Sequence, residues 1–340
     1  MPSSSKSVIA LVESAYDIHA EPRPWLDRLV ESAEELIGDG LGTMGVHGRR
    51  QAPGAPPDIA GASGSNELLM MQAMMVRDLP QSTIDRGTET GVAAVIDKYR
   101  EHPDHVEVFQ RHFRTLGAED ALSVTGIDPG GQGIHFFSLQ AERRKLDAWD
   151  RIRWKMLTAH LSAGLRLRTT LASPGEKAAP PERAEAVIDP NGFKVAEFAG
   201  SDGAKHSVEA LRESAIQQDK VRAARNQDAN ELLESWEALV RGRWSMVDWF
   251  DTDGRRYVLA LPNPPDVTDP RALTERESQV AAYAAIGESH KMIGYRLGIS
   301  RVRVTNHLRS VMEKLGVKTN AELVHRLRGF SDVPMRDAGE

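Results

Sequence analysis

The sequence of 340 residues contains no cysteine. This absence excludes disulfides, thiolate zinc sites, iron–sulfur clusters and a cysteine nucleophile. The sequence also lacks any uninterrupted apolar stretch near the ~18 residues that would suggest a membrane span. The apolar run Val8–Val12 near the N-terminus is too short for a signal peptide. We therefore expect a cytoplasmic protein without a membrane partner.

The composition predicts a multidomain globular protein with an uneven charge distribution. At roughly 100–200 residues per domain, the length predicts two or three domains. The net charge is −6, but residues 271–330 hold eleven Lys and Arg against five Asp and Glu, a net +6 that leaves −12 elsewhere. An acidic body with a basic C-terminal segment is typical of an appended module that binds a polyanion. The alternative is a small helical domain that is basic by chance.

The first half of the chain alternates helical and strand patterns. Residues 7–37 predict two helices, 40–47 a short strand, 51–66 a loop rich in Pro, Gly and Ala, and 67–117 further helices. A hairpin at 121–139 and a long helix at 143–171 follow. The apolar stripe of that helix holds Trp149, Ile152, Met156, Leu157, His160, Leu161 and Leu165. Its basic end, at Arg166 and Arg168, suits the negative end of the helix dipole.

Proline-rich segments separate the predicted units. The first unit resembles GAF-type sensory modules in the order of its predicted helices and strands. The second unit resembles a PAS-type module. It consists of a strand pair, two helices ending near Arg241 and a final hairpin with the aromatic cluster Trp244, Trp249 and Phe250. These resemblances imply a mixed sheet around either a small-molecule cavity or a filled structural core. The predicted boundaries are 1–172 (GAF-like), 173–183 (linker), 184–261 (PAS-like), 262–270 (linker), 271–330 (helix-turn-helix) and 331–340 (tail).

The C-terminal segment predicts four short, capped helices. Thr274 with Glu277 and Thr319 with Glu322 form capping boxes, and Ser289 and Ser300 occupy N-cap positions. The short turn Gly298-Ile299-Ser300 joins the second helix to the third. The predicted inward residues are Val280, Ala281, Ala284, Ala285, Ile293, Leu297, Val304, Leu308, Val311, Leu315, Leu323, Val324 and Leu327. Such a set describes a compact helix-turn-helix domain.

The outer face of the third helix suits a DNA groove. At about 100° per residue, the face opposite the apolar stripe carries Val302, Arg303, Thr305, Asn306, Arg309 and Ser310. A major groove accepts one helix, with Arg reading guanine and Asn reading adenine. Lys291 and Arg301, near helix starts, are placed to contact phosphates. The alternative is a solvated polar face on a domain that binds protein.

This segment resembles the LuxR-type helix-turn-helix family over about sixty residues. The matching stretches are Leu273-Thr274-Glu275-Arg276-Glu277, Gly287-Glu288-Ser289-His290-Lys291-Met292-Ile293-Gly294, Leu297-Gly298-Ile299-Ser300, Val304-Thr305-Asn306-His307 and Lys314-Leu315-Gly316-Val317. The resemblance implies that Thr305, Asn306 and Arg309 contact bases, that Lys291 and His307 contact the DNA backbone, and that the fourth helix dimerises. The family usually has Thr at the position of Arg303, Lys at that of Thr305 and an acidic residue at that of Met292, so the operator sequence does not carry over.

The sequence therefore predicts a sequence-specific DNA-binding transcription regulator. Its fold class is multidomain α+β, with a GAF/PAS-like mixed α/β sensory region followed by an all-α four-helix domain. We expect a homodimer on an inverted-repeat operator of double-stranded DNA, with the N-terminal region sensing a small molecule or a partner. The predicted DNA-binding residues are Lys291, Arg301, Arg303, Thr305, Asn306, His307 and Arg309.

Two other functional classes stay open at this point. The first is a signalling scaffold whose C-terminal helices bind protein. The second is an enzyme that uses the sheet cavity, but no catalytic constellation, cofactor motif or metal-ligand spacing can be assembled from the sequence. His102, His105 and His112 fit no single helical face, so we expect exposed or capping roles for them, and His160 reads as a core histidine.

Overall fold

The computed structural model describes residues 5–49, 57–87, 89–128, 130–172, 182–198, 205–223, 244–251, 253–263, 273–315 and 317–328. Most of both predicted linkers, the tail and the second helix expected before Arg241 lie outside these residues. The predicted domain boundaries therefore stay predictions.

The N-terminal half is built on a five-stranded sheet with the strand order β2-β1-β5-β4-β3. The mixed α/β character expected of this region is confirmed, but every described strand pair is antiparallel, so the mixed sheet that the GAF-type and PAS-type resemblances imply is wrong. Edge strands β2 and β3 lie in segments predicted as loop and helix. The bounds are β1 (Thr43–Arg49), β2 (Asp58–Ser63), β3 (Gly91–Ala94), β4 (Asp120–Ile127) and β5 (Gln132–Gln140).

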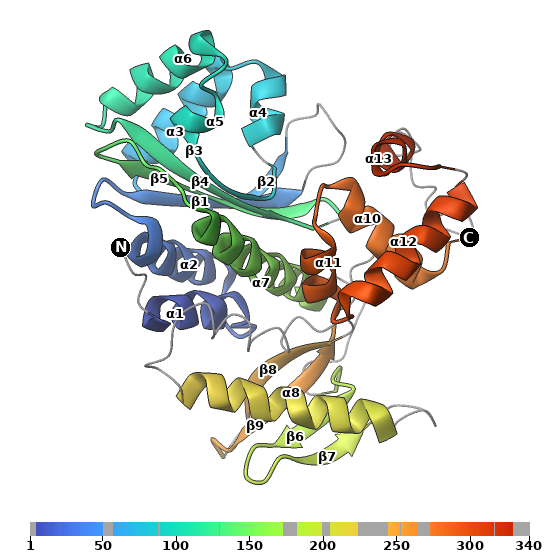
Figure 1. Ribbon diagram of the computed structural model, residues 1–340. Coiled ribbons are helices and arrows are strands. Elements are labelled where there is room, and N and C mark those ends of the chain that lie inside the picture. Colours follow the sequence, from blue (N-terminus) through green and yellow to red (C-terminus); the bar gives the residue numbers. More distant parts are fainter. Residues whose placement is uncertain are drawn as a thin grey trace, which may run out of the picture.

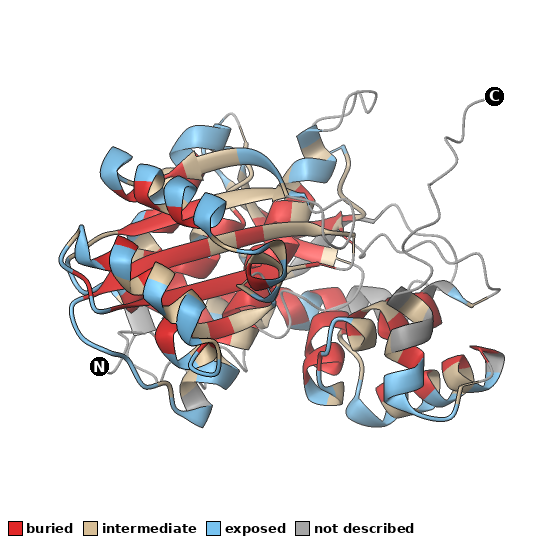
Figure 2. Cartoon of the chain, turned by 90° about the horizontal axis from the view of Figure 1, so that it is seen from above, coloured by how far each residue is buried: buried red, intermediate tan, exposed pale blue. Residues whose placement is uncertain are grey.

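Helices cover both faces of this sheet (Figure 1). One face carries α1 (Ser5–Ala15), α2 (Pro22–Ile37) and α7 (Ala148–Ala172), and the other carries α3 (Asn66–Asp78), α4 (Gln81–Gly87), α5 (Val95–Lys98) and α6 (Pro103–Arg114). Strand β5 serves both layers. Its Ile134 and Phe136 belong to the cluster with α1, α2 and α7, and its Phe137 and Leu139 to the cluster with α3, α5 and α6. The strands consequently form a buried middle layer, with exposed residues on the outside of the helices (Figure 2).

The long helix α7 lies at the centre of the molecule. A Cβ at Gly164 would lie 2.4 Å from the Ala15 carbonyl oxygen, so the close crossing of α1 and α7 depends on that glycine. Most of the predicted stripe is buried; Ile152 is an exception at 40% exposed, and the Trp149 side chain is outside the described set.

The predicted role of Arg166 and Arg168 at the end of this helix is wrong. Helix α7 continues to Ala172, so neither arginine lies in its last turn. Arg166 instead pairs with the buried Asp128 carboxylate and bonds the Asn263 side chain at 3.1 Å. Arg168 donates to the main-chain carbonyls of Asp17 and Ala20. Tertiary contacts therefore hold both cations.

A smaller sheet with the order β7-β6-β9-β8 lies below the first (Figure 1). It is formed by the two predicted strand pairs, and its elements are β6 (Ala186–Asp189), β7 (Lys194–Phe198), β8 (Trp244–Phe250), β9 (Arg256–Pro262) and the covering helix α8 (Lys205–Ala223). Its apolar residues belong to the same core cluster as α1, α2 and α7. Of the aromatic cluster in the final hairpin, Trp244 and Trp249 are half-buried and Phe250 is 56% exposed.

The C-terminal helices are α10 (Glu275–Ala285), α11 (His290–Leu297), α12 (Arg301–Leu315) and α13 (Asn320–Arg328). They lie beside α7, with α11 nearest to it (Figure 1). The expected four-helix domain is therefore present. Within the described part of the chain, no helix combines the length and apolar character that crossing a membrane requires.

Candidate nucleic-acid interface

Helices α11 and α12 are joined by a tight turn that depends on two glycines. Gly298 has φ 62°, the left-handed conformation that ends α11, and its N–H donates to the Gly294 carbonyl. The Ile299 N–H donates to the same carbonyl at 3.0 Å. A Cβ on Gly294 would lie 2.6 Å from the Ile299 carbonyl oxygen, so only glycine lets the turn approach the helix this closely. The turn thereby fixes the angle between α11 and α12.

The predicted caps form, with one difference. Thr274 and Glu277 make a reciprocal capping box on α10, and Ser289 accepts from the Met292 N–H of α11. The Ser300 hydroxyl accepts from the Arg303 N–H at 3.3 Å. At α13, Thr319 accepts from the Glu322 N–H, but the Glu322 carboxylate reaches the N–H of Lys318 rather than that of Thr319. The second predicted box is therefore only half formed.

The buried carboxylate of Glu277 also holds α12 in place. This side chain is 5% exposed; its Oε2 accepts from the Thr274 N–H at 2.8 Å, and its Oε1 accepts from the Ser310 hydroxyl at 2.6 Å. Ser310, which we placed on the outer face of α12, therefore turns inward. Because a charged acceptor makes stronger hydrogen bonds than a neutral one, Glu277 links the start of α10 to the middle of α12.

The outer face of α12 remains open to solvent. Val304, Leu308 and Val311 are buried, at 0%, 3% and 0% exposed, and fix the inward side of the helix. The predicted contact residues fall into two groups, the exposed Lys291, Arg301, Arg303, Asn306 and Arg309 and the half-buried Thr305 and His307. Four of the exposed residues, Lys291, Arg301, Arg303 and Arg309, are cationic, and the exposed Glu313 further along α12 is acidic. The surface can therefore offer fixed hydrogen-bond donors to an anionic partner.

The Thr305 hydroxyl already has two contacts within the domain, although we predicted that Thr305 contacts a base. Its hydroxyl donates to the Arg301 carbonyl at 3.1 Å and lies 3.3 Å from His290 Nδ1 at the start of α11. These contacts fix the side chain against the neighbouring helix. Its methyl group, rather than its hydroxyl, is thus the part that can meet a partner.

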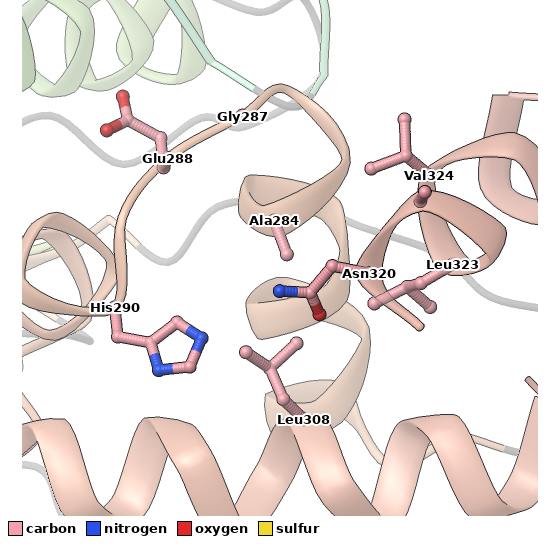
Figure 3. Close-up of a pocket in the computed structure, with 9 residues that line it drawn as sticks. Ala284, Gly287, Glu288, His290, Leu308, Asn320, Leu323 and Val324 are labelled. Carbon is pink, nitrogen blue, oxygen red and sulfur yellow. The ribbon is translucent and has the colours of Figure 1, made fainter. Parts of the chain in front are cut away.

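A groove lies among the four helices of the domain. It has a volume of about 500 Å³ and is bordered by the starts of α11 and α13 together with α10 and α12. His290, Leu308 and Asn320 point into it (Figure 3). Leu308 belongs to the inward stripe of α12, whereas His290 lies 3.3 Å from Thr305, so the groove adjoins the face of α12 that carries Thr305.

The second helix of the domain has a buried face that the sequence analysis missed. All residues from Met292 to Leu297 are buried, and Met292 and Tyr295 belong to the core cluster of the N-terminal half. Tyr295 Oη lies 2.7 Å from Nε2 of His160 on α7, and Nδ1 of His160 lies 3.4 Å from the Tyr16 hydroxyl. Burial lowers the pKa of His160 to about 3, so its ring is neutral at physiological pH. Helix α11 is thus packed between α12 and α7.

A buried ion pair lies in the same contact. Arg296 donates to Glu288 Oε1 at 2.9 Å and to the Ser162 hydroxyl of α7 at 3.1 Å, and both charged side chains are 2% exposed. The guanidinium also lies 5.4 Å from the Tyr283 ring centroid. Nearby, burial raises the pKa of Tyr283, and the Arg166 guanidinium of α7 acts against this rise. Polar and charged groups therefore make much of the contact between the C-terminal helices and α7.

His102, His105 and His112, for which we expected exposed or capping roles, all have protein partners, and the expectation is wrong for His112, which is buried at 7% exposed. His102 Nε2 lies 2.9 Å from Arg86, His105 Nδ1 3.0 Å from Thr83, and His112 Nε2 2.9 Å from Asp78. Within the described ranges, no group of three or more His, Asp and Glu side chains is arranged to hold a metal ion.

A helix seated by a tight turn on the preceding helix, with its opposite polar face open to solvent, defines a helix-turn-helix domain. Residues 271–327 match the family described as "Bacterial regulatory proteins, luxR family". This segment is therefore a luxR-family helix-turn-helix domain, as the sequence motifs predict.

A relative and two solved structures complete the comparison. The transcriptional regulatory protein UhpA of Salmonella typhimurium is 46% identical over 55 residues, 16% of this chain, and the chain spans 28% of that protein's length. A crystal structure of Escherichia coli SdiA gives a TM-score of 0.30 at 12% identity, covering 95% of each chain. SdiA in complex with octanoyl-rac-glycerol gives 0.29 at 12% identity, covering 95% of this chain and 93% of that one. TM-scores this low carry no inference about the present protein.

Proposed function

We propose that this protein is a sequence-specific DNA-binding transcription regulator that inserts α12 into the major groove of double-stranded DNA. The observation that carries the proposal is the outer face of α12, where Arg303, Asn306 and Arg309 are exposed while the opposite stripe is buried. A helix of this kind fits the groove and can read base edges through bidentate Arg–guanine and Asn–adenine pairs. The luxR-family match of the same residues supports this proposal.

The roles of the surface residues follow from their positions. Arg303, Asn306 and Arg309 would contact bases, and the Thr305 methyl group would meet a thymine methyl. Lys291 and Arg301 lie at the starts of α11 and α12, where they would bind phosphates together with the positive ends of the helix dipoles. His307 is half-buried and would contact the DNA backbone. The DNA contacts proposed for this surface involve no enzymatic reaction.

The rest of the proposal concerns assembly and input. A homodimer would place two copies of α12 about 34 Å apart on an inverted-repeat operator. The N-terminal region would sense a small molecule or a partner and act in the cytoplasm on the position of the C-terminal domain. Such control requires that the input bind two states of the protein with different affinity.

Gel shifts with operator fragments selected from random oligonucleotides test the DNA proposal. Arg309→Ala should weaken the selected site by about 1–3 kcal/mol and relax base preference, whereas Lys291→Ala should weaken all sequences alike and lower the salt slope by about one. Arg114→Ala, an exposed arginine on α6, is the control and should leave binding unchanged.

Unchanged binding by Arg309→Ala would refute the docking of α12. A chain with no DNA affinity at low salt, but with salt-insensitive binding to a protein, would instead favour the signalling scaffold.

A further inference from the structure

Helix α3 carries an apolar stripe that faces solvent. Met70 is 67% exposed and Met74 is 48% exposed, while Met71 and Met75 are buried on the inner side of the helix. The helix belongs to the layer on the opposite face of the sheet from α7 (Figure 1). Large apolar side chains that are exposed at consecutive turns of one helix are typical of a surface that another protein covers.

A charged residue extends the stripe at each end. In the order Glu67, Met70, Met74 and Arg77, the residues follow at intervals of three, four and three positions, so they lie within an arc of about 80° on one side of the helix. Glu67 is exposed, and the side chain of Arg77 is 76% exposed. Arg77 lies 3.7 Å from its neighbour Asp78. An ion pair this exposed is weak, so the guanidinium can turn toward another carboxylate.

The stripe is complementary to a second copy of itself. The midpoint between Met70 and Met74 is position 72, and position 72 is also the midpoint between Glu67 and Arg77. Two copies of α3 that pack antiparallel about a twofold axis at this level bring each Met70 to the partner's Met74. The same axis brings each Glu67 to the partner's Arg77. The helix dipoles run in opposite directions in this arrangement and attract each other. An identical chain therefore matches both the apolar centre and the charged ends.

We propose that α3 forms an interface between two copies of this chain, with the two helices antiparallel across a twofold axis. Met70 and Met74 of both copies form its apolar centre, where flexible thioether side chains adapt to the shape of the contact. Ala73 is exposed beside these methionines, and its small side chain lets the helix axes approach to about 8–10 Å. The ion pairs between Glu67 and Arg77 flank the centre and fix the antiparallel direction.

The size of the contact sets the expected affinity. Helix α3 has 13 residues. One pair of such helices buries less than the ~1,600 Å² of a standard protein–protein interface, so we expect a dissociation constant of about 1–100 μM. The inference names a surface for the homodimer of the proposed function, and it rests on that function for any role on DNA. Association through α3 itself requires no DNA, because none of the residues proposed to contact DNA lies on this helix.

Sedimentation of the full chain without DNA tests the interface. The parent should pass from monomer to dimer between about 1 and 100 μM. Met70→Glu places a carboxylate in the apolar centre and should weaken the dimer by about tenfold or more. Since Met70 is 67% exposed, this substitution leaves the fold of the monomer intact. Ile152→Glu, a similar change at a 40% exposed position on α7, is the control and should associate like the parent.

Charge reversal tests the antiparallel arrangement. Glu67→Arg brings two cations together at each end of the contact, and Arg77→Glu brings two anions together there, so each variant alone should dimerise about fivefold or more weakly. A mixture of the two variants restores opposite charges at both ends, and heterodimers should form with an affinity near that of the parent. Glu31→Arg, the same reversal at an exposed position on α2, is the control and should associate like the parent.

Three results would overturn the proposal. The first is a chain that stays monomeric throughout this concentration range. The second is a dimer that Met70→Glu leaves intact, because another surface, such as α13, would then hold the two copies together. The third is a mixture of the charge variants that forms no more dimer than either variant alone. Since sedimentation uses no DNA, a failed α3 interface and a failed DNA interface are told apart by comparison with the gel shifts.

Discussion

Replacing Glu288 with Gln should loosen the contact between the helix-turn-helix domain and α7. Glu288 and Arg296 are each 2% exposed and 2.9 Å apart. The substitution keeps the shape of the side chain but leaves the guanidinium with the Ser162 hydroxyl, the new amide oxygen and the Tyr283 ring. Removing one partner of a buried ion pair costs about 3–5 kcal/mol, and the amide oxygen retains part of the hydrogen bond, so we expect about 3 kcal/mol.

Detachment of α11 from α7 would lower the free-energy cost of Glu288→Gln. If α11 detaches from α7, the Arg296 guanidinium is hydrated, and the loss cannot exceed the free energy that docks the domain. Two measurements separate these cases. Denaturant unfolding gives the total loss, and hydrogen exchange at Ala159–Ala163 on α7 reports detachment while the rest of the chain stays folded.

Glu313→Gln is the matched control, because it makes the same change at an exposed position on α12. If Glu288→Gln and Glu313→Gln behave alike in both measurements, the ion pair does not hold the domain and the reasoning is refuted. Replacing the pair by apolar side chains, Glu288→Leu with Arg296→Met, should restore much of the lost stability, since no unpaired charge is then buried.

Two further predictions concern α7. Burial lowers the pKa of His160 to about 3 and that of His135 to about 4, from 6.5. The unfolded chain therefore binds protons that the folded chain does not, and the free energy of unfolding should fall by up to about 1.4 kcal/mol per pH unit for each histidine as the pH drops below 6.5. His160→Gln should reduce this slope in denaturant titrations. An unchanged slope would contradict the pKa assigned to His160. Gly164→Ala would put a Cβ 2.4 Å from the Ala15 carbonyl oxygen and should cost about 1–3 kcal/mol in the same assay, whereas an unaltered midpoint would mean that α1 moves freely.

The parts of the fold that could be predicted are those specified by neighbouring residues. The N-caps at Thr274, Ser289 and Ser300 form as predicted because each satisfies backbone groups only three positions away. The turn at Gly298 depends on the backbone freedom of its own residues. The hairpin of β4 and β5 and the two strand pairs of the smaller sheet were also predicted, since alternation and turn residues lie next to each other in the chain.

The predictions were wrong where packing between residues far apart in the sequence determines the local structure. Strand β2 follows a segment rich in Pro and Gly, and its only described neighbour in the sheet is β1, so its local pattern resembles a loop. Ser310 has the helical phase of an outer residue but turns toward Glu277, 33 positions earlier in the sequence. Arg166 resembles a residue that stabilises a helix end, yet it binds Asp128 and Asn263 from other elements.

The sequence by itself determined the helix-turn-helix domain, because the caps, the turn and the 3.6-residue period that form α12 are all encoded within a few positions. Only the tertiary structure decided what surrounds that module. Met292, Tyr295 and Arg296 lie outside the inward stripe predicted for their helix, and they are buried only because α7 covers them. His160 on α7 contacts Tyr295 across 135 positions of sequence. A pairing over such a distance leaves no local pattern, because its energy comes from desolvation and contact that exist only once the chain is folded.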